Sequence, residues 1–389
     1  MGGGLMQLVA YGAQDIYLTG NPQITFFKVV YRRHTNFSME SIQQTFNGTA
    51  DFGRKVTCTV SRNGDLINRM YVSASLPKPQ QNTGMGAASN DDDEYVENVG
   101  HNLLKSVEIE IGGQRIDKHY GDWLYIWNEL TQTAGHYDGY KNMVSLDKPS
   151  EGGTVIVPLQ FWFCRNPGLA LPLIALQYHE VKINIEFANY IDCITGTGAN
   201  GGGNQMKLDQ TQLYVDYVYL DTDERRRFAQ VSHEYLIEQL QFTGDEALSG
   251  SVKLNFNHPV KELIWVEKSN DAKPCTYIAN YTHAQIQLNS HERFSERDRD
   301  YFELVQPYQH HERVPVDATG VRAKISVYSF ALKPEEHQPS GTCNMSRIDN
   351  ATLKLAGLKD TEGSSLKVYA VNYNVLRIMS GMGGLAYSN

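Results

Sequence analysis

Short runs of alternating apolar and polar residues recur along the whole chain, which is the pattern of half-buried β-strands. The runs are rich in Val, Ile, Thr, Tyr and Phe, and residues typical of turns separate them. Asn63-Gly64 follows the first run directly and predicts a hairpin turn into the second. The pattern predicts strands at residues 55–60, 66–76, 103–111, 155–163, 181–187, 213–220, 235–242, 252–256, 263–266, 284–288, 325–330, 351–355 and 366–378.

Helical periodicity is confined to two short stretches. In residues 121–131 the apolar side chains recur at i, i+3, i+4 and i+7, so they lie on one face of a helix: Trp123, Ile126, Trp127 and Leu130. We interpret this stripe as a helix that faces the core, in preference to part of a cofactor site. Residues 295–304, which are rich in charges of both signs, predict a second helix.

A highly charged segment, residues 221–228, follows an aromatic strand and divides the chain into two parts. We expect an N-terminal arm at 1–25, a first β-sandwich at 26–222, a linker at 223–231 and a second β-sandwich at 232–389. Each part supplies the seven or eight strands of one sandwich. Residues 65–71 faintly resemble residues 259–265, so any internal repeat is architectural. The predicted class is therefore all-β with few short helices.

The N-terminal arm has too few residues for a core of its own and too many apolar ones to remain in water. Pro22 biases Asn21 towards extended geometry, so we expect the arm to leave the domain and pack against a neighbouring molecule. The alternative is an arm that folds back on the first sandwich. Residues 77–100 and 195–205, rich in turn residues, predict two long exposed loops.

Charge and cysteine content exclude several classes of protein. The 389 residues carry 44 acidic and 35 basic side chains, a net charge of −9, without a basic stripe that would bind nucleic acid. The five cysteines contain no CxxC pair, which indicates reduced thiols in a reducing compartment. No apolar run reaches the ~18 residues that span a bilayer, and no signal peptide is expected.

Three polar clusters could bind a metal ion, but each has a simpler interpretation. The acidic run 91–94 lacks the alternating ligands and the glycine turn of a calcium loop, which favours a solvated loop. His310-His311-Glu312 and Glu335-Glu336-His337 would each need a distant partner, because neighbouring side chains of a strand point to opposite faces. We interpret both of these clusters as surface edges.

Other polar segments also lack a specific chemical pattern. Residues 291–300 could form an acid–base site, but a solvated helix face or a salt-bridge patch between subunits fits the mixed charges better. Residues 200–204 lack the context of a phosphate-binding loop. Arg225-Arg226-Arg227 suggests a structural clamp between the two parts more than a nucleic-acid patch. We therefore expect no catalytic, cofactor-binding or metal-binding residues and no enzymatic activity.

The N-terminal segment 12–37, GAQDIYLTGNPQITFFKVVYRRHTNF, resembles the opening of the major capsid proteins of nucleocytoplasmic large DNA viruses. Further similar segments are GQRIDK at 113–118, LPLIALQYHEVK at 171–182 and PSGTCNMSRID at 339–349. The resemblance implies two consecutive eight-stranded antiparallel jelly-roll sandwiches per chain. It also implies homotrimers with a hexagonal outline that build the icosahedral shell of a double-stranded DNA virus.

The residue patterns agree with this resemblance, because an acidic two-sandwich chain without a catalytic group suits a shell subunit. We expect a structural major capsid protein without a cofactor, made in the host cytoplasm and located in the virion. Its expected partners are further copies of itself and minor capsid proteins beneath the shell, where an inner membrane could lie close, without direct contact to nucleic acid. Two alternatives stay open: a carbohydrate-binding or carbohydrate-active β-sandwich protein, and a minor capsid subunit of the same fold.

Overall fold

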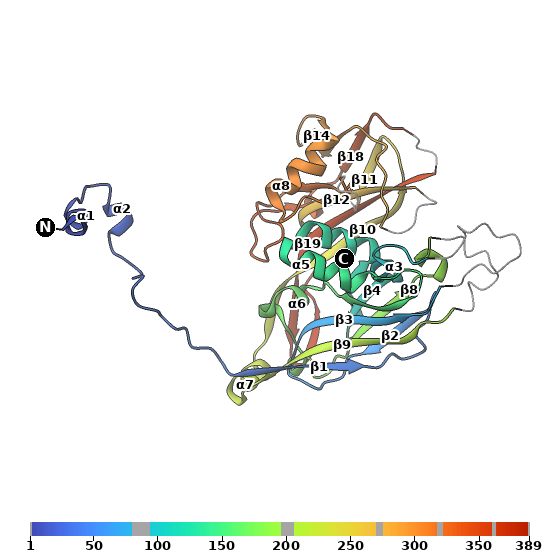
Figure 1. The fold of residues 1–389 in the computed structure, drawn as a ribbon, viewed down its shortest axis with the longest axis horizontal. Coiled ribbons are helices and arrows are strands. Elements are labelled where there is room, and N and C mark those ends of the chain that lie inside the picture. The colour runs from blue at the N-terminus through green and yellow to red at the C-terminus, as the bar shows by residue number, and fades with distance from the viewer. Residues whose placement is uncertain are drawn as a thin grey trace, which may run out of the picture. The chain divides into compact units, whose positions relative to one another are not determined.

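The computed structural model describes residues 2–79, 94–195, 206–269, 275–316, 322–359 and 363–387. The chain forms two compact units, which divide between Asn36 and Phe37 (Figure 1). The first unit contains two short helices, α1 (Gly3–Val9) and α2 (Ile16–Thr19), and neither helix buries a residue. All the strands of the described ranges belong to the second unit.

The first half of the second unit is a sandwich of two antiparallel sheets. One sheet has the strand order β1-β9-β3-β6, with β7 also paired to β3, and the other has the order β2-β8-β4-β5. Both sheets contribute side chains to one apolar core. The strands are β1 (Phe37–Gln44), β2 (Lys55–Thr59), β3 (Leu66–Leu76), β4 (Leu104–Ile111), β5 (Gln114–Tyr120), β6 (Gly153–Pro158), β7 (Leu171–Pro172), β8 (Val181–Phe187) and β9 (Asp209–Leu220).

The second half repeats this architecture. Its sheets have the orders β10-β19-β12-β16, extended by β17 and β20, and β11-β18-β13-β14, with β15 paired to β13. The strands are β10 (His233–Ala247), β11 (Ser251–Leu254), β12 (Pro259–Ser269), β13 (His283–Leu288), β14 (His291–Glu292), β15 (Arg297–Asp298), β16 (Ser326–Ser329), β17 (Cys343–Asn344), β18 (Ala351–Ala356), β19 (Ser364–Met379) and β20 (Met382–Leu385).

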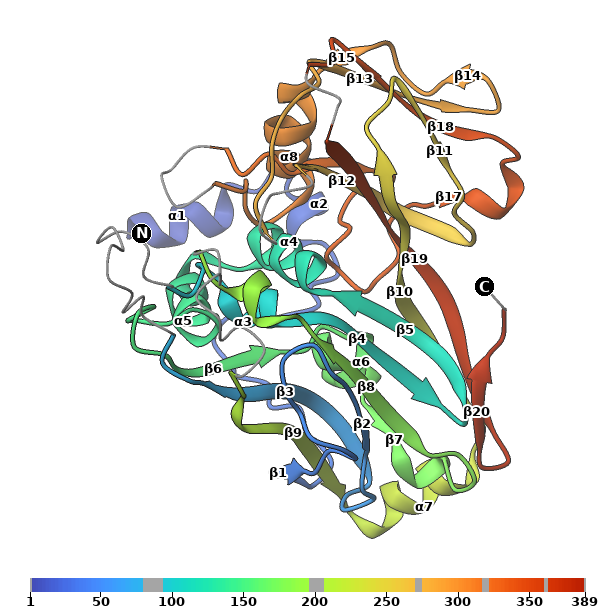
Figure 2. The ribbon, with the colours of Figure 1, turned by 90° about the vertical axis from the view of Figure 1, so that its right-hand side faces the viewer.

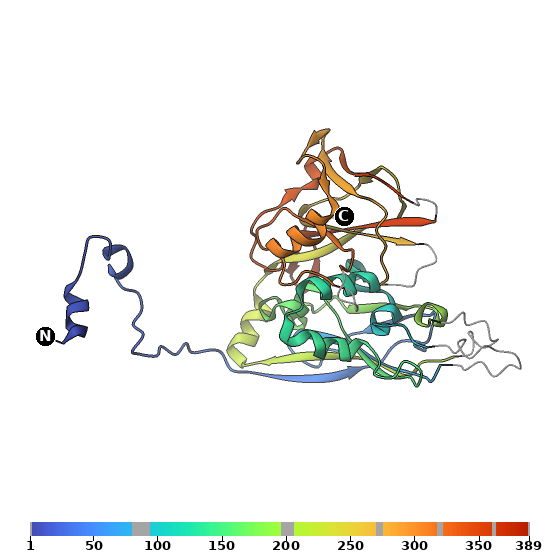
Figure 3. The same ribbon diagram turned by 45° about the horizontal axis from the view of Figure 1, so that its top comes forward.

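The two halves share one strand order, since β1-β9-β3-β6 corresponds to β10-β19-β12-β16 and β2-β8-β4-β5 corresponds to β11-β18-β13-β14. This is the order of a jelly roll, so the chain contains two consecutive eight-stranded jelly-roll sandwiches. Figures 1 and 3 show the first sandwich, in blue to green, on one side of the second, in yellow to red. The faintly similar segments 65–71 and 259–265 lie on equivalent strands, β3 and β12.

Helices fill the space between and beside the sheets. The predicted helix at residues 121–131 is confirmed with the same ends as α4, and all its residues from Gly121 to Leu130 are buried. The other helices are α3 (Val99–Leu103), α5 (Ala134–Val144), α6 (Trp162–Arg165), α7 (Thr222–Gln230) and α8 (Gln306–His310), with short turns η1 (Pro167–Leu169), η2 (Leu173–Ala175), η3 (Tyr190–Cys193), η4 (Tyr301–Val305) and η5 (Met345–Arg347).

Strand β12 shows how the two sandwiches are joined, and Figure 2 shows it in the same view as helix α4. Leu263 and Trp265 belong to the core of the second sandwich, whereas Ile264 and Val266 belong to a separate apolar core that includes Trp123 of α4. Both faces of β12 are therefore buried, and its burial pattern no longer alternates as that of β8 does. We call this second set of contacts the inter-sandwich core, and it packs α4 against β12, β16 and β19.

Two predictions of local structure are wrong. Asn63-Gly64 does not form a hairpin, because β2 pairs with β8 while β3 pairs with β9 in the opposite sheet. Glycine is required there for another reason: a Cβ on Gly64 would lie 2.7 Å from the Cβ of Tyr217. Residues 295–304 are not one helix, since β15 occupies 297–298 and helical geometry begins at Arg299 and continues through α8.

Some predicted strands end at other residues than the observed strands, and some predicted loops fall on residues that the structure does not describe. The strand predicted at 155–163 ends at Pro158, and β1 and β5 lie in segments where no strand was predicted. Most of the loops expected at 77–100 and 195–205 lies outside the described residues. No disulfide joins any of the five cysteines, all of which the structure describes. None of the helices in the described ranges has the length and apolar content to cross a membrane.

Candidate functional site

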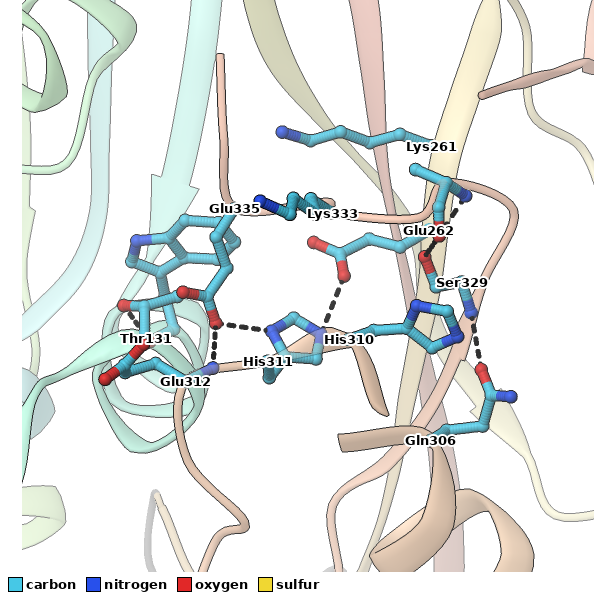
Figure 4. A network of polar contacts seen from close by, with 12 residues as sticks. Thr131, Lys261, Glu262, Gln306, His310, His311, Glu312, Ser329, Lys333 and Glu335 are labelled. Carbon is cyan, nitrogen blue, oxygen red and sulfur yellow. Dashed lines mark hydrogen bonds and ion pairs between the residues drawn. The ribbon is translucent and has the colours of Figure 1, made fainter. Parts of the chain in front are cut away.

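The two predicted His/Glu clusters meet in the second sandwich (Figure 4). His311 follows α8 directly, and its Nδ1–H donates a hydrogen bond of 2.8 Å to Oε1 of Glu335, in the loop between β16 and β17. The backbone N–H of Glu312 donates to the same oxygen, which fixes the position of Glu335. The expectation of a surface edge is wrong for His311, whose side chain is fully buried.

The other ring nitrogen of His311, Nε2, lies 3.0 Å from Oε2 of Glu262 on β12. Burial alone would lower the pKa of His311, but Glu262 and Glu335 outweigh this effect and raise it to about 9. His311 is therefore a buried imidazolium between two carboxylates at neutral pH. Helix α8 is held in place on the same side, since the side chain of Gln306 accepts a hydrogen bond of 3.0 Å from the backbone of Ser329.

A second group of charges surrounds Glu238 on β10. Its carboxylate lies 2.7 Å from Nζ of Lys261 and 2.9 Å from Arg165, which belongs to α6 of the first sandwich. Burial alone would raise the pKa of Glu238, but His337, Lys261 and Arg165 lower it to about 2. The Arg165 guanidinium also lies 4.0 Å from the ring centre of Trp127. These contacts fasten the two sandwiches to each other.

This arrangement is suited to holding the structure together, because its charged groups neutralise one another. No three His, Cys, Asp or Glu side chains in the described ranges are arranged to hold a metal ion. His310 and Glu312 do not join His311: His310 bonds to the backbone oxygen of Leu332, and Glu312 is exposed. Residues 91–93 and 200–204 of the predicted polar segments lie outside the described residues.

The remaining predicted segments form ion pairs with other parts of the chain. In segment 291–300, Asp298 pairs with His283 at 2.8 Å and Arg299 pairs with Glu303 at 3.1 Å. Arg225 on α7 lies 2.9 Å from Asp65, directly before β3, and so ties the linker to the first sandwich. These segments therefore bind other parts of the same chain.

A further polar cluster surrounds Asp122 and has no signal in the local sequence pattern. Asp122 in the first turn of α4 accepts a hydrogen bond of 2.7 Å from Lys367 on β19 and lies 3.9 Å from Lys268 on β12. Burial alone would raise the pKa of Asp122, but the two lysines lower it. Lys367 is 245 positions away in the sequence, so no local spacing could have indicated this contact.

Two of the places where the second unit exposes large apolar side chains lie next to short loops of the sandwiches. Tyr308 and Leu332 are 80% and 73% exposed, and the bond from His310 to Leu332 holds their segments together. Tyr178, Met379 and Met382 are 75%, 48% and 51% exposed, and Tyr178 bonds to Gly381 in the turn between β19 and β20. Clustered exposed apolar side chains are typical of surfaces that contact other proteins.

Comparison with known proteins agrees with the fold. Residues 25–221 match the family described as the N-terminus of the major capsid protein, and residues 224–384 match the family described as the large eukaryotic DNA virus major capsid protein. The chain is 65% identical to the major capsid protein of Pyramimonas orientalis virus and 46% identical to that of Paramecium bursaria Chlorella virus 1, in both cases over 100% of each chain. Among solved structures, the quasi-atomic model of the PBCV-1 virus capsid matches with a TM-score of 0.80 and 41% identity, covering 94% of this chain and 100% of that one.

Proposed function

The chain belongs to the major capsid protein family of large eukaryotic DNA viruses, and from this premise we propose that three copies form one capsomer of an icosahedral shell. The protein has a structural role in the capsid of the virion. In the proposed capsomer the trimer has a nearly hexagonal outline and encloses, together with many others, a double-stranded DNA genome.

The observation that carries the trimer proposal is the shared strand order of the two sandwiches. Two similar sandwiches per chain give six similar sandwiches around a threefold axis, so a trimer can fill a position with six neighbours in a lattice. The exposed apolar side chains around Tyr308 and Tyr178 support contacts between copies, because burying such area drives association.

Native mass spectrometry of the purified protein at micromolar concentration tests this proposal. We expect a particle of three chains of 43.9 kDa each, and negative-stain images with a hexagonal outline. A monomer at this concentration, or a ring with a number of chains other than three, would overturn the trimer. The copy number in purified particles separates a major subunit, present in hundreds of copies or more, from a minor subunit of the same fold.

We further propose that the protein is synthesised in the host cytoplasm, has no enzymatic activity and contacts minor capsid proteins beneath the shell. The N-terminal arm supports this last point, because its helices bury none of their apolar side chains. The net charge of −9 supports the absence of direct contact with nucleic acid. Crosslinking of purified particles, followed by identification of the peptides joined to residues 1–25, tests the proposed partner. Crosslinks from the arm to genomic DNA in place of protein would contradict it.

A further inference from the structure

Between the N-terminal arm and β1 lies a segment of unusual composition, residues 26–36, with the sequence FFKVVYRRHTN. Five of its first six side chains are large and apolar, and basic side chains follow them. None of the residues 2–36 is buried. We call residues 26–33 the basic apolar segment, and its side chains are free to contact a partner.

The apolar side chains of this segment are almost completely exposed. Phe26 and Phe27 are 87% and 97% exposed, and Val30 and Tyr31 are 81% and 85% exposed. The two phenylalanines lie at a turn, where the backbone N–H of Phe27 donates a bond of 3.4 Å to Oγ1 of Thr25. Turns normally carry Gly, Pro, Asn, Asp or Ser, so turn geometry does not account for two phenylalanines. We call Phe26 and Phe27 the aromatic tip, and contiguous exposed apolar side chains of this kind mark a contact surface.

The charge of the segment is opposite to that of the rest of the chain. Its charged residues are Lys28, Arg32 and Arg33, and none of them forms an ion pair with a described residue. Residues 1–36 contain these three basic residues and one acidic residue, Asp15, which gives a net charge of +2. Because the whole chain carries −9, residues 37–389 carry −11. The partner of the segment should therefore combine apolar surface with negative charge.

The arrangement of the apolar side chains favours a lipid surface over a protein surface. Alternate residues of an extended chain point to opposite faces, and here both sets are apolar: Val30 belongs to one set, and Val29 and Tyr31 belong to the other. A protein surface, such as the acidic surface of another copy, would cover one set and leave the other in water. Hydrocarbon is non-directional, so a bilayer can take up both sets. Aromatic and basic side chains together are also typical of segments at the headgroup boundary.

We propose that residues 26–33 bind the surface of a lipid bilayer with anionic headgroups. The aromatic tip enters the boundary between the headgroups and the acyl chains. Lys28, Arg32 and Arg33 contact the lipid phosphates, and their long side chains can reach the headgroups while the neighbouring apolar side chains are buried. Binding of this kind does not depend on the proposed trimer, because the segment lies in a compact unit of its own.

Flotation of the full chain with lipid vesicles tests the proposal. We expect binding to vesicles of phosphatidylcholine that contain phosphatidylserine, and much weaker binding to vesicles of phosphatidylcholine alone. Each basic residue near an anionic surface contributes a factor of about five to the partition coefficient. The variant Arg32→Gln/Arg33→Gln should therefore bind the anionic vesicles at least tenfold more weakly. Phe26→Ser/Phe27→Ser keeps the charge and should also lose at least tenfold.

Lys253→Gln/Lys354→Gln is the matched control, because it removes the same charge from exposed positions on β11 and β18. This variant should bind like the unmodified protein. The proposal is wrong if the unmodified protein does not float with the anionic vesicles. Equal binding of Arg32→Gln/Arg33→Gln and the unmodified protein would also overturn it. Native mass spectrometry of each variant shows separately whether the trimer has formed.

A fluorescence measurement reports where the aromatic tip lies. The four tryptophans of the chain are all buried, so a fifth at position 27 gives a distinct signal. In Phe27→Trp we expect vesicles with brominated acyl chains to quench the added emission, whereas the emission of the unmodified protein should not change. Emission from Phe27→Trp that stays unquenched in the presence of these vesicles would show that the aromatic tip contacts protein or water in place of lipid, and would contradict the proposal.

Discussion

His311 is kept in its charged form by two carboxylates from different parts of the second sandwich. Neither partner is close in sequence, since Glu335 is 24 positions away and Glu262 lies on a separate strand. Local spacing could identify the His and Glu residues as polar clusters, but only the tertiary fold brings β12 next to the end of α8. The result is an ion network that fixes an otherwise irregular loop to the sheet.

The charged state of His311 predicts a loss of stability at alkaline pH. Its pKa is about 9 in the folded protein and about 6.5 in an unfolded chain, so protonation favours folding. This contribution, about 3 kcal/mol, is fully present below pH 6.5 and is lost as the pH rises through 9. Urea unfolding at several pH values between 6 and 10 measures this decrease.

The double variant His311→Gln/Glu262→Gln removes both the imidazolium and its buried partner. Its stability should therefore change much less over the same pH range. His310→Gln is the control, because His310 is only partly buried and is not part of the ion network. A decrease of equal size in the double variant would show that another group causes the pH dependence.

The stability that Glu267 on β12 contributes should also decrease as the pH rises, but in a lower pH range than for His311. Burial raises its pKa to about 7, although the backbone N–H of Asn280 and the charge of Arg299 lower it. Its neutral form favours folding, so its contribution is present below about pH 4.5 and is lost as the pH rises through 7. Glu267→Gln should therefore have a free energy of unfolding that is higher than that of the unmodified protein at pH 8, by about 1–3 kcal/mol. At pH 4.5 the two free energies of unfolding, measured with urea, should be similar. Lower stability of Glu267→Gln at pH 8 would contradict this prediction.

At the scale of elements, α4 joins two sandwiches that could otherwise move independently. Trp123 is completely buried, and its ring centre lies 5.5 Å from that of Tyr369 on β19. Replacement of a buried tryptophan by alanine costs about 3–5 kcal/mol. We expect Trp123→Ala to lower the free energy of unfolding by this amount, measured by urea unfolding, and to increase hydrogen exchange in both α4 and β19.

Lys253→Ala provides the comparison for this variant, since Lys253 is an exposed residue on β11. A surface substitution of this kind changes stability by about 0.5 kcal/mol or less. If Trp123→Ala has an effect as small as this control, the inter-sandwich core does not contribute to stability as we propose.

The elements also show which parts of the fold local patterns can predict. Strands such as β3 and β8 alternate because one face is buried, and their predicted ends are confirmed. The turn at Asn63-Gly64 has the chemistry of a hairpin, but in a jelly roll the chain crosses there from one sheet to the other. Sequence patterns could place the strands but not their partners, because pairing between distant strands depends on the packing of the whole sandwich. Strand β5 was missed because polar residues interrupt its apolar face.

For the whole molecule, we expect the N-terminal arm to contribute to assembly and not to folding. Neither α1 nor α2 buries a residue. Deletion of residues 2–20 should leave the trimer folded, with its melting temperature nearly unchanged, but should impair shell assembly or the attachment of minor capsid proteins. Size-exclusion chromatography and assembly assays measure the two properties separately.

Loss of folding in the isolated trimer would contradict this prediction. The arm would then belong to the core of the first sandwich, which was the alternative left open by the sequence. A second variant keeps the full length of the arm but replaces Leu5 and Leu8 by serine. It separates the effect of the apolar side chains from the effect of a shorter chain. This variant should assemble as poorly as the deletion if the apolar side chains provide the contact.

The inter-sandwich core also has a consequence for how a shell could curve. Large apolar contacts between domains oppose hinge motion, and here α4 is buried against β12, β16 and β19. Each chain therefore behaves as a rigid body in which the two sandwiches keep a fixed angle. The curvature of a shell would then arise at the contacts between neighbouring subunits, whose angles can differ from place to place. The same polypeptide can in this way line both flat facets and sharp edges without changing its own shape.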